Sequence, residues 1–320
     1  MRIGTRSSKM AMAQTRHVVD LLRSACAGLE PRIVESSPLG DRDQISKLDR
    51  HGGKGGAFVE EIRTAMREGA LQAAMHSLKD MPGDEEAPGL VIGAALKRDC
   101  AEDALVLRKG LSIEAFFKSK AAGMKIGTNS VRRAAYLRRL FPEALVIHYR
   151  GAADTRIRKL EGGVMQGLPD GGEVGPADAL VMAQSGLLRV GAEDRISHVF
   201  SHAEMLPAVG QGIVAVECCA DDWETRALLA KVGHAPTRLR MDAEREVLWV
   251  LNGHCNTPIA AHAKLDGDIM MLKAAVMSED GATFLEVSEN GPCDRPRELG
   301  RSVGLSLLQQ GAAKLIDDTR

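Results

Sequence analysis

The chain has 320 residues, of which 44% are hydrophobic, 27% are charged and only 3% are aromatic, and its formal net charge is −1. This length and composition predict a globular protein of two or three domains. A charge near zero argues against a general nucleic-acid binder, and scarce aromatic residues argue against stacking on single strands, so no nucleic-acid partner is expected.

Three further features of the sequence indicate where the protein is located and which partners it lacks. No run of about 18 apolar residues occurs, so no membrane partner is expected. The chain enters a predicted strand at once, without a signal-peptide pattern, which favours a cytoplasmic location. None of the six cysteines forms a C-x-x-C pair, so we expect no metal site. We also expect a monomer.

The N-terminal third predicts the first α/β unit. Residues 2–8 read as a strand, a Gly-Thr turn and the start of a helix that extends to residue 26. A second strand is expected over 31–37 and an amphipathic helix over 57–68. Between them, residues 39–56 are polar and end in four glycines around Lys54, which predicts a flexible flap. No Gly-Lys-Ser/Thr follows, so we do not expect a nucleotide loop.

Residues 75–82 bring His, Ser, Lys and Asp together at the end of a predicted strand, where open α/β sheets present ligand sites. A plain structural alternative is that Asp80 caps a turn before Pro82. A hydrolase is poorly supported, because no G-x-S-x-G surrounds Ser77. A carboxylate among cations is instead suited to stabilising a cationic intermediate or to moving a proton.

Charged residues 97–103 are expected to form a hinge to a second lobe over about 103–205. There, residues 125–130 repeat the pattern of 2–8, and a helix is expected over 131–141 with Ser130 as its N-cap. The repeat predicts two similar lobes whose turns face a common cleft. A surface loop is expected over 162–176, before a strand over 179–182.

The start of the 131–141 helix is a candidate anion site. Free backbone N–H groups and the helix dipole favour an anion there. The arginines at 132, 133, 150 and 156 add forked donors suited to carboxylate or phosphate. A solvated basic face is the alternative, which we prefer for Arg138 and Arg139.

The remaining chain predicts a return to the first lobe and then a third region. A strand is expected over 213–218, after Gln211, whose two flanking glycines favour either close approach to a ligand or a tight turn. From residue 222 we expect a small α+β domain with helices over 241–251 and 296–315 and strands over 259–265, 269–277 and 284–288. Cys255 lies in its 252–258 loop. A single loop cysteine is more often incidental than catalytic, and the neighbouring His254 makes only a weak metal pair.

These motifs resemble the porphobilinogen deaminase (hydroxymethylbilane synthase) family over residues 2–265. The matching segments, in order, are 3–8, 76–82, 127–133, 150–156, 206–212 and 251–255 with Pro258. The resemblance implies an α/β fold with two lobes like type II periplasmic binding proteins and a small C-terminal α+β domain. The implied domains are 1–98 with 206–220, then 103–205, then 222–320.

The resemblance also implies a chemistry. The family joins four porphobilinogen molecules, with loss of ammonia, onto a dipyrromethane cofactor held by a thioether that here matches Cys255, and releases hydroxymethylbilane for haem biosynthesis. Asp80 matches the catalytic aspartate, which we expect to be a buried carboxylate that stabilises positive charge near pyrrole N–H groups. The implied cofactor- and substrate-binding residues are Arg6, Ser8, Gln14, Phe58, Lys79, Thr128, Ser130, Arg132, Arg133, Arg150, Arg156, Arg189 and Gln211.

The chain departs from the family pattern in three places. His254 stands where the family usually has Gly, Ala152 stands where it has Asn, and the glycine-rich loop is one residue longer between Lys54 and Phe58. The departures point to altered efficiency or to a second copy in a specialised pathway. The alternative function is a two-lobed binding protein that retains a polyanion-binding cleft and has lost turnover.

Overall fold

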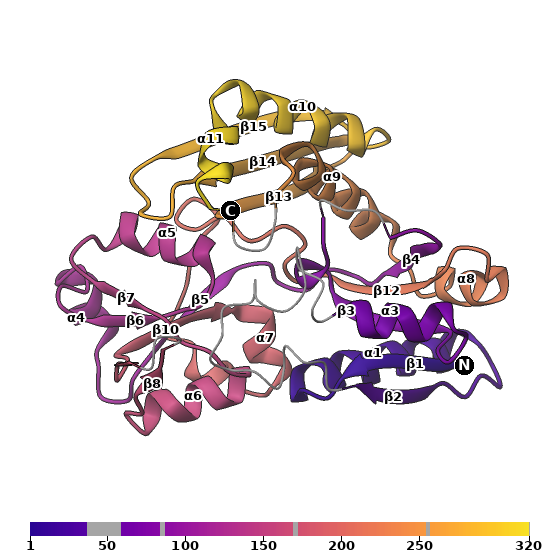
Figure 1. The fold of residues 1–320 in the computed structure, drawn as a ribbon, viewed down its shortest axis with the longest axis horizontal. Coiled ribbons are helices and arrows are strands. Elements are labelled where there is room, and N and C mark those ends of the chain that lie inside the picture. The colour runs from indigo at the N-terminus through magenta and orange to yellow at the C-terminus, as the bar shows by residue number, and fades with distance from the viewer. Residues whose placement is uncertain (37–58, 84–86, 169–171, 254–256, 320) are drawn as a thin grey trace.

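The computed structural model describes residues 1–36, 59–83, 87–168, 172–253 and 257–319, which form two lobes below a third, C-terminal domain (Figure 1). The predicted flap at 39–56, Phe58 and Cys255 lie outside the described residues.

The first lobe is built on a five-stranded sheet. Its strand order is β2 (Arg32–Ser36), β1 (Arg2–Arg6), β3 (Ala73–Ser77), β12 (Val214–Cys219) and β4 (Leu90–Ala95). Strand β1 pairs parallel with β2 and β3, whereas β12 runs antiparallel to β3 and β4. Helices α1 (Lys9–Ala25), α3 (Glu60–Arg67) and α8 (Trp223–Ala230) pack on this sheet.

Helix α1 has the bounds that its sequence predicts. Ser8 is the N-cap, and its Oγ accepts a hydrogen bond from the Ala11 N–H at 3.3 Å. The helix ends at Cys26, and its face with Val18 and Leu22 is fully buried against the sheet. The predicted helix over 8–26 is therefore confirmed.

The second lobe repeats the first. Its sheet has the order β7 (Leu145–Ile147), β6 (Lys125–Gly127), β10 (Ala179–Ala183), β5 (Asp103–Leu107) and β11 (His198–Val199), so β6, β10 and β5 correspond to β1, β3 and β12. Its helical elements are α4 (Ile113–Lys118), α5 (Val131–Leu140), α6 (Ala153–Glu161), α7 (Gln184–Arg189) and the 3-10 turn η4 (Glu193–Arg195). The predicted pair of similar lobes is confirmed. The expected surface loop at 162–176 contains a short ladder of β8 (Gln166–Gly167) and β9 (Glu173–Val174).

Two crossover segments join the lobes. Residues 96–102 lead from β4 into β5, and residues 200–213 lead back from β11 to β12. In each lobe the strand that the chain enters from a crossover, β12 or β5, runs antiparallel to its neighbours, and the expected hinge at 97–103 coincides with the first crossover segment. Both segments run beneath the C-terminal domain (Figure 1).

The C-terminal domain has an antiparallel sheet of β13 (Ile259–Asp266), β14 (Ile269–Met277) and β15 (Phe284–Pro292), with helices α9 (Ala235–Leu251), α10 (Pro296–Gln309) and α11 (Ala312–Asp317). Helix α9 starts earlier than the expected residue 241, because Pro236 occupies its first turn, where proline is tolerated. The expected single helix over 296–315 is broken at Gly311, whose φ is +100°.

Packing places the domain over both lobes. Ala260, Ala275 and Met277 share an apolar core with Tyr136 and Phe200 of the second lobe. Met241 of α9 packs in another core with residues of the first lobe. By contrast, α8 packs on β4 and β12, so residues 222–230, which we expected to open the third domain, lie on the first lobe.

Candidate functional site

Asp80 lies at the carboxyl end of β3, on the short 3-10 turn η3 (Leu78–Asp80). Leu78 is 2% exposed and anchors this turn in the core. The Asp80 side chain is 40% exposed, and its Oδ2 lies 4.0 Å from Nη1 of Arg6 at the end of β1. Our expectation of a buried carboxylate is therefore wrong: because η3 follows the last residue of the strand, Asp80 projects beyond the sheet.

Lys79 lies beside Asp80 and points toward the second lobe. Its Nζ is 3.4 Å from Oε1 of Gln211. Burial and the positive charge of Arg133 lower the pKa of Lys79 to about 8, although Asp80 opposes the shift. The lysine is thus held among cations of both lobes.

Arg132 and Arg133 lie in the first turn of α5, as predicted, and both are turned into the protein. Arg132 Nη2 donates to Oδ2 of Asp103 at 2.7 Å, and Arg133 Nε donates to Oδ1 at 2.9 Å. Arg132 Nη1 donates to the Leu206 carbonyl at 2.8 Å. Burial tends to raise the pKa of Asp103, but the charges of Arg132 and Arg133 lower it to about 2. Asp103 is therefore an ionised, buried anchor for both arginines.

Gln211 connects this anchor to Lys79. Its buried side chain donates through Nε2 to Oδ1 of Asp103 at 2.9 Å, and its Oε1 accepts from Arg133 Nη2 at 3.3 Å. Of the two roles that the sequence allowed for its glycine neighbours, a tight turn against protein fits the structure. Gly212 has a φ of +84°, and a Cβ there would lie 2.7 Å from the Cys100 carbonyl oxygen.

Arg150 and Arg156 extend the basic surface from the end of β7 into α6. Arg150 is 8% exposed. Arg156 donates through Nε to the Gly151 carbonyl at 2.7 Å. Burial and the charges of Arg133 and Arg150 lower the pKa of Arg156 to about 10, while Asp80 opposes the shift. We call Arg6, Lys79, Arg133, Arg150 and Arg156, together with Asp80, the basic site.

The predicted hydroxyl residues lie at the starts of α1 and α5, and Gln14 lies in the second turn of α1. Ser130 caps α5, its Oγ accepting from the Arg133 N–H at 3.4 Å, and the Thr128 hydroxyl oxygen accepts from the Ser130 N–H at 3.1 Å. Gln14 is buried and exchanges hydrogen bonds with the Ser77 hydroxyl at 3.0 and 3.1 Å. Ser8 and Ser130 thus cap the N-termini of α1 and α5, where free backbone N–H groups favour an anion.

Arg189 is paired with the first crossover segment. It ends α7, and its guanidinium pairs with Asp99 on the first crossover segment. Arg138 and Arg139 are exposed on the last turn of α5, as expected, but both contact the C-terminal domain: Arg138 donates to the Glu279 carbonyl, and Arg139 lies 4.7 Å from the centre of the Phe284 ring.

Sequence reasoning missed Asp103 as a functional position. It begins a strand of five buried residues, Asp-Ala-Leu-Val-Leu, and is itself 0% exposed. An aspartate that opens a wholly apolar strand must have cationic or hydrogen-bonding partners once it is buried. This signal was present in the sequence.

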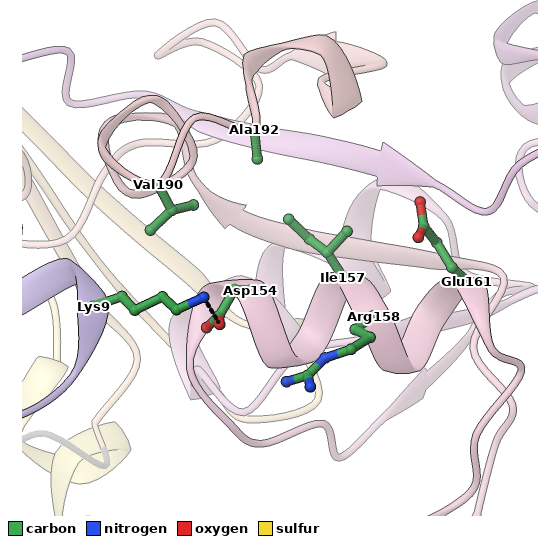
Figure 2. A pocket seen from close by; sticks show the side chains of 7 residues that line it. All are labelled: Lys9, Asp154, Ile157, Arg158, Glu161, Val190 and Ala192. Carbon is green, nitrogen blue, oxygen red and sulfur yellow. Dashed lines mark ion pairs between the residues drawn. The ribbon is translucent and has the colours of Figure 1, made fainter.

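A cavity of about 610 Å³ lies between the lobes, beside helix α6 (Figure 2). Lys9 of the first lobe reaches across to Asp154 of α6, and the Nζ–Oδ2 distance is 3.3 Å. Arg158 and Glu161 line the same cavity, so its lining charges balance in sign. The cavity thus differs in character from the basic site.

Among the described residues no helix is long and apolar enough to cross a bilayer. The same part of the chain has no cluster of three or more His, Cys, Asp or Glu side chains placed to bind a metal ion.

Comparison with known proteins gives the family. Residues 1–227 match the family model "Porphobilinogen deaminase, dipyromethane cofactor binding domain", and residues 238–309 match "Porphobilinogen deaminase, C-terminal domain". The chain belongs to the porphobilinogen deaminase family. It is 38% identical over 319 residues to the porphobilinogen deaminase of Desulforudis audaxviator, covering 99% of this chain and 97% of that one.

Other relatives agree with this assignment. Porphobilinogen deaminase 2 of Streptomyces coelicolor is also 38% identical over 319 residues, covering 99% of this chain and 96% of its own length. Among solved structures, the VFT2 domain of BvgS from Bordetella pertussis aligns with a TM-score of 0.41 and 15% identity, covering 72% of this chain and 85% of that domain. The resemblance seen in the motifs is thus confirmed at the level of the family and its cofactor domain.

Proposed function

We propose that the chain is a hydroxymethylbilane synthase. It joins four porphobilinogen molecules, with loss of ammonia, onto a dipyrromethane primer bound to Cys255, and releases hydroxymethylbilane by hydrolysis. The observation that carries the proposal is the basic site: cations from both lobes surround Asp80 in a member of this family.

The basic site fits a polyanion. Each porphobilinogen ring has an acetate and a propionate, so the primer and growing chain are rich in carboxylates. The lowered pKa values of Lys79 and Arg156 come from burial and from crowding by other cations, and a bound carboxylate relieves that crowding. The residues that would hold the dipyrromethane are the cations of the basic site together with Ser8, Thr128 and Ser130 at the helix starts.

Asp80 is the proposed catalytic residue. When bound, the dipyrromethane supplies the free α-carbon onto which porphobilinogen is added. The Asp80 carboxylate accepts hydrogen bonds from the pyrrole N–H of the substrate and stabilises the positive charge that develops as ammonia leaves. Its 40% exposure suits this role, because an incoming substrate must reach it from solvent.

Arg132 has a different proposed role from Arg133. Two of its donors are held by Asp103 and Leu206, so it contributes by fixing Asp103 beside Arg133. Phe58, Gln14, Arg189 and Gln211 complete the proposed site through the family resemblance. The same proposal includes the three-domain division, with residues 222–230 now placed on the first lobe, and a cytoplasmic monomer that acts on porphobilinogen.

The intact mass of the denatured protein tests the proposal. We expect an adduct of two pyrrole rings on the 34.3 kDa chain, absent from Cys255→Ser. Porphobilinogen is then added and ammonia release is measured. Ammonia release would exclude a binding protein without turnover. A bare chain that neither gains an adduct nor releases ammonia would refute the proposed function.

A further inference from the structure

Glu244 of α9 is a buried carboxylate at the junction of the C-terminal domain and both crossover segments. Its side chain is 0% exposed. Its Oε1 accepts from the Ala263 N–H and its Oε2 from the Gly210 N–H, each at 2.8 Å. The carboxylate therefore ties a strand of the C-terminal domain to the second crossover segment.

Arg98, on the first crossover segment, completes this junction. Its Nη1 lies 2.5 Å from Oε1 of Glu244, and its side chain is 3% exposed. Its Nε donates to the Gln211 carbonyl at 2.9 Å. Glu244 and Arg98 thus hold backbone groups of two adjacent residues, the Gly210 N–H and the Gln211 carbonyl.

The side chain of the same Gln211 reaches the basic site. Its Nε2 donates to the Ala101 carbonyl at 2.6 Å as well as to Asp103, while Oε1 faces the cations of Lys79 and Arg133. The carboxamide has one orientation, because its NH2 group faces hydrogen-bond acceptors and its oxygen faces hydrogen-bond donors. Holding the Gln211 backbone therefore fixes the position of Oε1 between a lysine of the first lobe and an arginine of the second.

We infer that Arg98 is a positioning residue for the proposed reaction, acting through Gln211 on Lys79 and Arg133. The inference rests on the proposed function for its effect on turnover. Displacements of about 1 Å in charged groups that hold a substrate change rates strongly, so a contact remote from Asp80 can affect catalysis. Because Arg98 pairs with Glu244 of the C-terminal domain, the position of that domain also affects the geometry of the basic site.

Arg98→Lys is the first test. Lysine keeps a positive charge for Glu244 but lacks the forked guanidinium, so the donor to the Gln211 carbonyl is lost. We expect about a tenfold fall in the rate of porphobilinogen consumption per folded, cofactor-loaded enzyme. The control is Arg238→Lys: Arg238 also bridges domains, donating to the Ile92 carbonyl at 2.8 Å, but does not contact Gln211. The control should keep the wild-type rate.

A double-mutant cycle separates positioning from general stability. In a Gln211→Leu background, Arg98→Lys should change the rate less than twofold, because its route to the basic site is already removed. An equal tenfold loss in both backgrounds, or no loss in the wild-type background, would overturn the inference.

Lys79 provides a readout that does not depend on turnover. Labelling by an amine-reactive reagent over a pH series, read by peptide mass spectrometry, should have a midpoint near pH 8 in the wild type. Arg98→Lys should move the midpoint downward, since Oε1 of Gln211 no longer stabilises the ammonium group, and Arg238→Lys should not. An unchanged labelling midpoint in Arg98→Lys contradicts the inference, whether or not the wild type consumes porphobilinogen. A wild type that consumes no porphobilinogen refutes the proposed function but not the positioning of Lys79 by Arg98.

Discussion

The two lobes share one strand order and one turn sequence but use charge in opposite ways. In the first lobe the strand ends carry Arg6 and Asp80, which are 26% and 40% exposed and lie 4.0 Å apart. In the second lobe Arg132 and Arg133 are nearly buried and are both fixed to Asp103. The second lobe thus presents a rigid cationic wall, and the first presents a solvent-accessible acid. A repeated framework thus carries a buried, paired set of arginines in one lobe and an exposed carboxylate in the other.

The largest expected effect is at the accessible acid. Asp80→Ala should lower ammonia release by at least about a hundredfold, because the carboxylate stabilises charge mainly in the transition state. Cofactor loading and the melting temperature should stay near wild type, since the side chain is half-exposed. Ammonia release and intact mass are the measurements. Full activity in this variant would show that Asp80 only caps a turn.

The matching change in the rigid wall is Asp103→Asn. It leaves two buried guanidinium groups without their carboxylate, which typically costs about 3–5 kcal/mol of unfolding free energy. Urea unfolding measures this cost, and the dipyrromethane adduct should be lost with it. Asp178→Asn is the control, because Asp178 pairs with the more exposed Arg108 in the same lobe and should cost under about 1 kcal/mol. Equal effects at both sites would show that the two lobes do not differ in this way.

A third prediction concerns pH at the junction above the lobes. Burial, with the charge of Arg98, lowers the pKa of His262 to about 2. The unfolded chain therefore binds a proton below about pH 6.5 that the folded protein does not, and stability falls as the pH falls. The loss should be about 2 kcal/mol between pH 7 and pH 5.

His262→Asn should flatten this part of the stability curve measured by urea unfolding. His17→Asn, on the exposed side of α1, is the matched control and should leave the curve unchanged. An identical acid-induced loss in His262→Asn and wild type would contradict the assignment.

The smallest expected effect is at an exposed ion pair between the lobes, Lys9–Asp154 (Figure 2). Because Lys9 is 77% exposed, Lys9→Gln should change stability by no more than about 0.5 kcal/mol, and salt should remove the difference. Thermal melts at low and high ionic strength measure it. A larger, salt-independent effect would show that the lobes are held together more firmly than an exposed ion pair allows.

Much of this architecture could be predicted from the sequence, because local signals and global fold agree. Ser8 and Ser130 mark helix starts, and the repeated Gly-Thr turn reveals two lobes before any contact is known. The positions that organise the basic site are harder to predict. Asp103, Gln211 and Arg98 come together only through the crossovers, over separations of about a hundred residues, and no periodicity encodes such pairings.

The sequence also did not predict how far individual side chains of the site are buried. The motif identified Asp80 but not its exposure, because exposure depends on how far η3 carries the side chain past the sheet. The motif likewise grouped Arg132 with Arg133. Only the structure shows that the two arginines differ in their partners, because Arg132 donates to the carbonyl of Leu206, which is distant in the sequence.

The return of β12 to the first lobe has a consequence for how the chain is made. Among the described residues, strand β4 lies at the edge of its sheet and pairs with β12, which ends at Cys219. During synthesis, β4 therefore waits for a partner while the whole of the second lobe emerges from the ribosome. The second lobe is continuous in sequence and can fold at once, whereas the first stays open-edged until residue 219 has been made. The first lobe is therefore completed only after the second has been synthesised, and the edge of its sheet stays unpaired in the nascent chain for that interval.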